Sequence, residues 1–323
     1  MSEDAIAAKS WPLAARAPGK CILFGEHAIV YGKPELVLAI DLYAQMGIRE
    51  ASSLSLNGDR RPLEHNPYLR AGVDHFGAAA IPLELRVTSR IPRAAGLGSS
   101  AAFCANLATA FSAAAGGCSR AELHQRSFLI ERSAQGVGSP GDTAAAVAGG
   151  YLALNDSAGA PLWEITDGDR QWDVHRIGDP GWIWVVAYSG VPRNTADAVR
   201  RVAERLAAPD GPRLLDELEE VAHEGISAVE HEDRARVGAL LTRNQGILRQ
   251  LGVSHPRLEA LIDALGPATE GVKLTGAGAG GSVVGLPKVG REQECVRSVA
   301  HAGGLAFIVR PAREGAQLIG APS

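Results

Sequence analysis

Cysteine, aromatic side chains and net charge are all scarce in this sequence. The four cysteines (Cys21, Cys104, Cys118 and Cys295) lie far apart, and none forms a CxxC pair. This spacing suggests neither a zinc ribbon nor a disulfide framework, so reduced thiols are expected. With a net charge of −4 and 5% aromatic residues, the chain lacks a basic field that would attract nucleic acid or an anionic membrane. Any anionic ligand must therefore be held locally.

Long apolar runs are absent as well. No segment reaches the roughly 18 uninterrupted apolar residues that a membrane span needs. The first residues, MSEDAIAAKSWPLAA, begin acidic and lack the basic start and apolar core of a signal peptide. The sequence therefore predicts a cytoplasmic protein.

The first half of the chain reads as strands followed by helices. Residues 20–48 contain short apolar runs typical of strands, and residues 52–69 are polar with proline and glycine, which predicts a loop. Residues 101–115 are alanine-rich, which predicts a buried helix that ends at two glycines. A capping box of Ser119 and Glu122 predicts the start of the next helix.

The second half has a different order, which starts with the apolar strand WIWVVAYSG. Four helical stretches follow, and the chain then continues with two strands, a helix near 291–302 and a last strand, LAFIVRP. This order of strand, helices, strand, strand, helix, strand is the split-βαβ or ferredoxin-like arrangement with inserted helices. We expect an α+β protein of two domains, 1–176 and 177–323.

Three glycine-rich segments are candidates for phosphate contact: APGKCILFGEHAIVYGKP (17–34), IPRAAGLGSSAA (91–102) and KLTGAGAGGSVVG (273–285). Each one alone is equally well explained as a plain turn. The second is the most informative, because backbone N–H groups at a helix start have no internal partner and bind phosphate oxygens well. Its hydroxyls, Ser99 and Ser100, either cap the helix or ligate magnesium.

Taken together and in this order, the three segments resemble the signature motifs of the GHMP small-molecule kinases. The first is most similar to that of the mevalonate kinases, and SGVPRNTADAV (189–199) and NQGILRQLGVSHPRLEAL (244–261) resemble further segments of the same group. The resemblance implies a ribosomal-S5-like N-terminal domain that binds nucleotide and a ferredoxin-like C-terminal domain. It also implies ATP and Mg2+ as cofactors. The sequence departs from the third motif at Ala279, where glycine is usual.

Asp142, in GSPGDT, is the candidate catalytic base, because its small neighbours would let a carboxylate protrude from a helix start. An N-cap aspartate is the alternative interpretation from the residues alone. The resemblance favours the catalytic role and implies that Lys20, otherwise read as a surface residue, faces Asp142 and the reacting hydroxyl. Whether Asp142 accepts the proton or mainly stabilises charge stays open.

Glu131 is the candidate metal ligand, together with Ser100. Its position on the helical wheel falls among Leu123, Phe128 and Ile130, where an unpaired carboxylate would be costly. A structural salt bridge is the alternative. The resemblance implies the magnesium role, because it reproduces the spacing between Glu131 and Asp142.

The remaining site residues follow from the resemblance. It implies substrate contacts for His27 and Glu26, the latter also as a group that orients Lys20 or its loop. Arg193 and Thr195 are candidates for the mevalonate end of the site, since an arginine fork suits a carboxylate, although Thr195 could simply cap a helix. The implied nucleotide contacts are Ser89, Ala94, Ala95, Gly96, Leu97, Gly98, Ser99 and Ser100.

The function implied by these motifs is ATP-dependent phosphorylation of mevalonate to 5-phosphomevalonate in isoprenoid biosynthesis. Two alternatives stay open: a kinase of the same family that acts on another small alcohol or sugar, and an inactive metabolite-binding regulator on the same fold. The expected partners are mevalonate and MgATP, without nucleic acid or membrane. The oligomeric state stays open, with a homodimer as one possibility.

Overall fold

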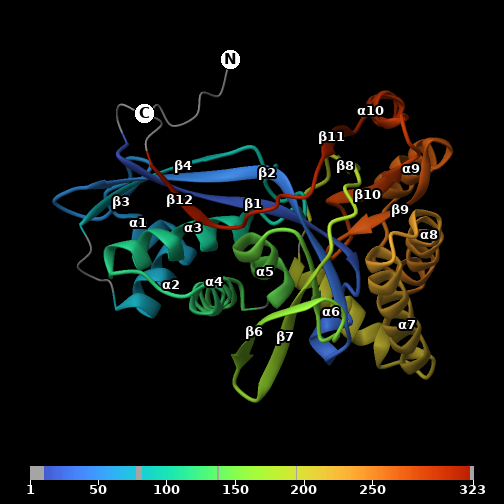
Figure 1. Ribbon diagram of the computed structural model, residues 1–323, viewed down its shortest axis with the longest axis horizontal. Coiled ribbons are helices and arrows are strands. Elements are labelled where there is room, and N and C mark those ends of the chain that lie inside the picture. The colour runs from blue at the N-terminus through green and yellow to red at the C-terminus, as the bar shows by residue number, and fades with distance from the viewer. Residues whose placement is uncertain (1–10, 78–81, 137, 194, 321–323) are drawn as a thin grey trace.

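The structure, a computed structural model, describes residues 11–77, 82–136, 138–193 and 195–320, apart from the side chains of residues 195 and 196. Two β-sheets, each covered by helices, make up the molecule (Figure 1). The expected α+β class is therefore confirmed. None of the helices in these described ranges is both long and apolar enough to cross a bilayer.

The first sheet has eight strands and is built around the long pair β1 and β2, which run antiparallel. Its main path has the order β12-β1-β2-β5-β7-β6, and β4 pairs with both β2 and β3. The strands are β1 (Leu13–Phe24), β2 (Glu35–Glu50), β3 (Ser55–Leu56), β4 (Leu83–Ser89), β5 (Tyr151–Leu154), β6 (Ala160–Asp167), β7 (Arg170–Ile177) and β12 (Gln317–Gly320).

Helices α1–α5 lie along one side of this sheet (Figure 1), and α3 and α5 pack directly on β1. Alanine and glycine allow this close approach, because small side chains let a helix lie near a strand. The helical elements are η1 (Ile29–Tyr31), α1 (Pro62–His65), α2 (Pro67–Phe76), α3 (Ser99–Ala114), α4 (Arg120–Gln135) and α5 (Pro140–Ala148). The predicted capping box of Ser119 and Glu122 starts α4 and is confirmed.

The second sheet has four strands in the order β11-β8-β10-β9. Numbered along the chain this order is 4-1-3-2, which is the pairing of a split-βαβ unit, and all its neighbours are antiparallel. The ferredoxin-like prediction is confirmed. Its elements are β8 (Trp184–Tyr188), α6 (Thr195–Leu206), α7 (Gly211–Glu230), α8 (Arg234–Gln250), α9 (Pro256–Leu265), η2 (Gly266–Ala268), β9 (Thr269–Thr275), β10 (Ser282–Pro287), α10 (Glu292–His301) and β11 (Leu305–Val309).

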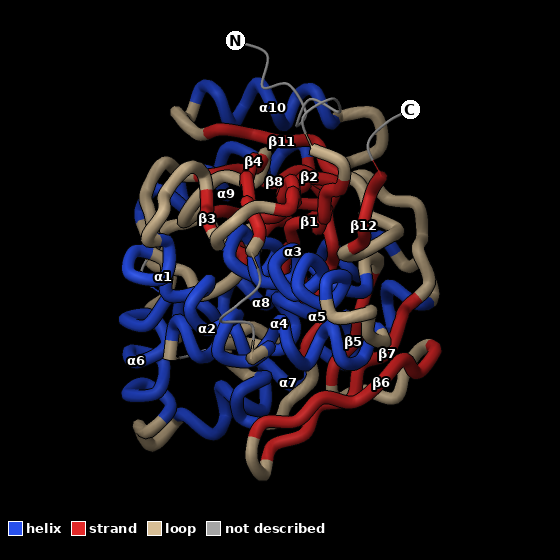
Figure 2. Tube along the Cα trace, turned by 90° about the vertical axis from the view of Figure 1, so that its left-hand side faces the viewer, coloured by secondary structure: helices blue, strands red, loops and turns tan. Residues whose placement is uncertain are grey.

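The two sheets share one continuous apolar core, in which α7 packs against β1. At this contact a Cβ on Gly225 would lie 2.3 Å from the ring of Phe24, so glycine is needed for the approach. Figure 2 shows α3 and α5 of the first half and α7 and α8 of the second half between the upper strands and the hairpin of β6 and β7. The first and second sheets are therefore connected by packed side chains in addition to the polypeptide backbone.

The structure differs from the sequence analysis in three elements. The predicted loop at 52–69 contains α1 and the start of α2, because Asn66 caps the helix and Pro67 takes its first position. The hairpin of β6 and β7 was not predicted, although a Gly168 turn joins the two strands. The predicted last strand is β11, but β12 follows it and pairs with β1. The proposed division at residues 176 and 177 separates β7 from β8 and remains a prediction.

Candidate active site

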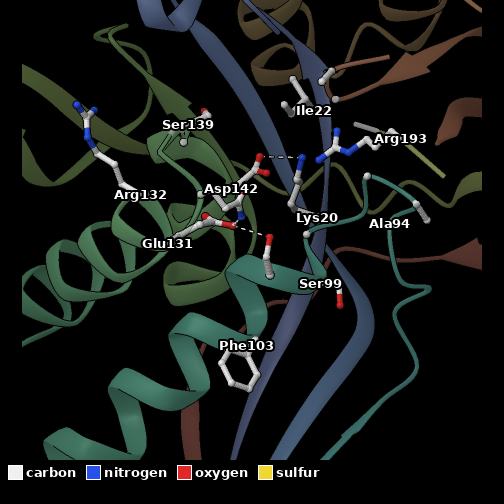
Figure 3. A pocket seen from close by; sticks show the side chains of 18 of the residues that line it. Lys20, Ile22, Ala94, Ser99, Phe103, Glu131, Arg132, Ser139, Asp142 and Arg193 are labelled. Atoms are coloured by element: carbon white, nitrogen blue, oxygen red, sulfur yellow. Dashed lines mark hydrogen bonds and ion pairs between the residues drawn. The ribbon is translucent and has the colours of Figure 1, made fainter. Parts of the chain in front are cut away.

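A cavity of about 920 Å³ opens where the first two glycine-rich segments meet α4 and α5 (Figure 3). The third segment contributes Gly276 and Ala277 to its wall. Of the predicted site residues whose side chains are described, all but Leu97 line this cavity. Residues from distant parts of the sequence thus converge on one space.

Lys20 and Asp142 face each other inside this cavity. The Nζ of Lys20, on β1, lies 2.7 Å from Oδ1 of Asp142 on α5. Lys20 is only 1% exposed, so its alternative interpretation as a surface residue is wrong. The N-cap of α5 is Ser139, and Asp142 is the third helical residue, so the N-cap interpretation of Asp142 is wrong as well.

Glu131 lies beside this pair on α4. Its Oε1 accepts a 2.6 Å hydrogen bond from the hydroxyl of Ser100 and a 3.1 Å bond from Gln135. Its buried Oε2 has no hydrogen-bond partner, and no ion pair of Glu131 is found in the described part of the chain. Burial, aided by the charge of Asp142, raises the pKa of Glu131 to about 7. The alternative interpretation of Glu131 as a structural salt bridge is therefore wrong for the described part of the chain, and one carboxylate oxygen is available to a ligand.

The second glycine-rich segment leads directly into α3. Gly98 is the N-cap with φ 79°, and no side chain caps the helix, so Ser99 and Ser100 belong to its first turn. A Cβ on Gly98 would lie 2.7 Å from Cγ of Lys20. Glycine is needed here both for the left-handed backbone and for the passage of the lysine. The free N–H groups of this turn face the cavity as a site for phosphate oxygens.

The third segment holds Arg193 in place. A Cβ on Gly276 would lie 2.3 Å from Nη1 of Arg193, and one on Gly96 would lie 3.2 Å from the same atom. The guanidinium thus lies between two glycine loops and points toward the part of the cavity that contains Lys20 (Figure 3). Ala279, the departure from the expected glycine, adopts a left-handed φ of 56°.

Glu26 and His27 of the first segment connect the two halves of the molecule. The carboxylate of Glu26 forms a fully buried ion pair with Lys273 on β9 and accepts a 3.1 Å hydrogen bond from Asn244 on α8. The Nε2 of His27 donates to the carbonyl of Ala277 at 3.2 Å. Burial lowers the pKa of His27 to about 4, so the ring is neutral at pH 7.

The comparisons with known proteins agree with this geometry. Residues 68–150 match the family described as "GHMP kinases N terminal domain", and residues 226–303 match "GHMP kinases C terminal". A mevalonate kinase of Methanothermobacter thermautotrophicus is 33% identical over 282 residues, which cover 84% of this chain and 88% of the relative. The chain belongs to the GHMP kinase family.

Two further relatives extend the comparison. A mevalonate kinase of Aeropyrum pernix is 33% identical over 328 residues, covering 94% of this chain and 97% of the relative. The crystal structure of the Methanococcus jannaschii mevalonate kinase has a TM-score of 0.75 and 24% identity, covering 92% of this chain and 98% of that one. The structural likeness supports the GHMP kinase fold.

The other residues predicted to contact ligands lie in different surroundings. Ser89 lines the cavity, and its hydroxyl both donates to the carbonyl of Ile91 and accepts from its N–H. The Leu97 side chain lies in the core, whereas its carbonyl accepts a 3.0 Å bond from the Lys20 N–H. Thr195 begins α6, and its side chain lies outside those described.

Sequence reasoning missed two buried ionisable residues: Glu35, which lines the cavity, and Lys273, which pairs with Glu26. Lys273 was quoted as part of the third segment but received no role, and Glu35 was passed over at the start of an apolar strand. Both are 0% exposed. A charged residue at the edge of an apolar run was the available signal, because such residues are rarely buried without a partner.

Proposed function

We propose that this GHMP kinase transfers the γ-phosphoryl group of ATP to the 5-hydroxyl of mevalonate. The observation that carries the proposal is the contact of Lys20 with Asp142 beside the helix start that is suited to phosphate. The similarity to mevalonate kinases over most of both chains supports mevalonate as the acceptor. The product would be 5-phosphomevalonate, an intermediate of isoprenoid biosynthesis.

Phosphoryl transfer needs alignment and charge stabilisation more than covalent chemistry. In the proposed mechanism Asp142 accepts the hydroxyl proton or stabilises the charge that develops there. Lys20, whose Nζ lies 2.7 Å from Oδ1 of Asp142, would stabilise the negative charge that develops on the alcohol oxygen. The first turn of α3 and the guanidinium of Arg193 face the same cavity and would hold phosphate oxygens or the acceptor's carboxylate.

The residues present also fit a magnesium ion. Glu131 has a buried oxygen without a partner, and Ser100 brings a hydroxyl to the same carboxylate. Oxygen donors of this kind suit Mg2+, which usually keeps water and takes further ligands from nucleotide phosphates. The described residues contain no cluster of three or more His, Cys, Asp or Glu side chains that could hold a metal, so the nucleotide would complete the site. A bound ion would supply charge neutralisation of the β- and γ-phosphates.

The same proposal includes a nucleotide-binding domain at 1–176, a second domain at 177–323 and a cytoplasmic location. All four cysteines are free thiols, which suits a reducing compartment. The proposed partners are small molecules, mevalonate and MgATP.

The test is to incubate the purified protein with MgATP and mevalonate and to follow ADP release. Product mass and NMR would identify the phosphorylated hydroxyl. Turnover of mevalonate supports the proposal. No turnover with mevalonate, together with turnover of another alcohol or sugar from a panel, would assign a different substrate. Nucleotide binding without turnover of any acceptor would indicate an inactive regulator.

A further inference from the structure

Glu35 is a buried carboxyl group in the active site that the mechanism above does not use. It is the first residue of β2, is 0% exposed and forms part of the wall of the cavity. No basic side chain forms an ion pair with it in the described part of the chain. A carboxyl group without a cation in such a place is costly, so its contacts need an explanation.

In the described part of the chain, the side-chain hydrogen bond of Glu35 is made at the start of α5. The hydroxyl of Ser139, the N-cap, donates to Oε2 of Glu35 at 3.2 Å and accepts the N–H of Gly141 at 3.2 Å. A Cβ on Gly141 would lie 1.8 Å from the same Oε2, so the carboxyl group rests directly on the backbone of this residue. Asp142 is the next residue along the helix (Figure 3).

The position of Glu35 is itself fixed from the other side. Its backbone pairs with Leu154 of β5. A Cβ on Gly25 would lie 2.1 Å from the carbonyl of Pro34 and 2.6 Å from Cα of Glu35, so the loop before His27 packs tightly against this strand end. Glu35 is therefore a rigid support between the strands of the sheet and the start of α5.

We infer that Glu35 is a positioning residue, whose carboxyl group sets the place of the first turn of α5 and thereby the direction of Asp142 toward Lys20. The inference rests on the proposed function, because it concerns the residue that faces the reacting hydroxyl. A displacement of roughly 1 Å at a catalytic group can cost about 100-fold in rate, so a support of this kind matters for turnover.

The protonation state of Glu35 agrees with a positioning role. Burial, followed by the charge of Asp142, raises the pKa of Glu35 to about 8, while Lys20 acts in the opposite direction and Glu26 adds a smaller upward effect. Glu35 is therefore neutral at pH 7. It fills its place beside the phosphoryl-transfer site without adding a negative charge that would repel the phosphates.

The test is a double-mutant cycle of Gly141→Ala, Glu35→Ala and both together. The methyl group in Gly141→Ala cannot coexist with the carboxyl group, so we expect kcat to fall by roughly 10-fold or more while the KM for ATP stays within about twofold. In the double variant the methyl group enters the space that the carboxyl group has left. Its kcat should therefore be no lower than that of Glu35→Ala. Gly246→Ala, on α8 with no atom within 4 Å, is the matched control.

The conservative variant Glu35→Gln distinguishes the positioning of α5 by the Glu35 side chain from an effect of a negative charge on that side chain. An amide oxygen can still accept the Ser139 hydroxyl, so this variant should keep most of the wild-type kcat at pH 7. In the wild type kcat should fall as pH rises through about 8, because Glu35 then gains a charge near Asp142. This fall should be absent from Glu35→Gln. The same fall in both proteins would remove Glu35 as its source.

Crystal structures of the same variants test the inference without activity. The distance from Lys20 Nζ to Asp142 Oδ1, 2.7 Å here, should lengthen in Gly141→Ala and return in the double variant. Additive losses of kcat, or an unchanged distance in Gly141→Ala, would overturn the inference. A wild-type protein that fails to phosphorylate mevalonate would overturn the proposed function alone, since the crystallographic distances would still decide the role of Glu35.

Discussion

The ammonium group of Lys20 lies 2.7 Å from Oδ1 of Asp142, although the two residues are 122 positions apart along the chain. Lys20 comes from the middle of β1 and Asp142 from the first turn of α5, and α5 packs on β1. The pair is nearly buried, so each charge depends on the other for stabilisation. This contact brings a carboxylate and a cation to one point of the cavity.

Replacing Asp142 by asparagine tests the proposed base. Asp142→Asn keeps the size of the side chain but removes the charge, so we expect kcat to fall by about 10² or more. Binding of ATP, measured by calorimetry, should be largely kept. Asp156→Asn is the matched control, because Asp156 pairs with His223 away from this cavity. Near-normal turnover of Asp142→Asn would remove Asp142 from its catalytic role.

The metal site is tested at Glu131. Glu131→Gln keeps an acceptor for the hydroxyl of Ser100 but removes the negative charge, so half-maximal activity should require more magnesium. The measurement is a magnesium titration at fixed ATP. Glu122→Gln, at the other end of the same helix, serves as the control. Identical magnesium curves for wild type and Glu131→Gln would contradict the assignment.

Gly276 is predicted to matter through Arg193. The methyl group in Gly276→Ala would lie 2.3 Å from Nη1 and displace the guanidinium. A hydrogen bond to a charged group contributes about 1.5–3 kcal/mol, so the KM for mevalonate should rise on the order of tenfold or more. Gly252→Ala has a similar positive φ and no atom within 4 Å, so it reproduces the backbone strain without the contact. Equal effects of both substitutions would indicate strain alone.

A buried histidine links stability to pH. The Nδ1 of His124 accepts the indole N–H of Trp163 at 2.8 Å, and its Nε2 donates to the carbonyl of Pro140 at 3.0 Å. Burial lowers its pKa from 6.5 to about 4. Between these values the unfolded chain binds a proton that the folded protein does not, so the free energy of unfolding should fall as pH drops from 6.5 to 4.

His124→Gln should lower stability at pH 7 and flatten this dependence. The check is the urea midpoint at several pH values between 4 and 7. The exposed His301→Gln is the control and should keep the wild-type slope. His27 shares the lowered pKa, so part of the slope should remain in His124→Gln. An unchanged slope in that variant would contradict the prediction.

The sequence predicted well where a local signal coincides with a structural need. The capping box at Ser119 and the order of elements after residue 177 depend on neighbouring residues and on apolar periodicity. The loop prediction at 52–69 failed because proline and polar residues are shared by loops and by first turns of helices. Asn66 followed by Pro67 was the sign of a helix start.

The sequence indicated which residues belong to the candidate site, but not which of them contact each other. Motif resemblance indicated Lys20 and Asp142, yet spacing along a chain contains no information on the partner of a buried carboxylate. The resemblance gave Glu26 a substrate contact or an orienting role, which stays a prediction, but it did not indicate the ion pair of Glu26 with Lys273 from β9. The need for glycine at position 276 could not be predicted either, because the side chain that requires it, Arg193, lies 83 positions away.

The pairing of β12 with β1 has a consequence for biosynthesis. β12 follows the whole second sheet in the chain, yet it forms an edge of the first. During translation, β12 leaves the ribosome only after residues 178–309. Until then the outer edge of β1 is unpaired and can pair with other strands. Completion of the first sheet is in this sense a late step of folding, and the exposed edge is the place where a nascent chain would need protection from aggregation.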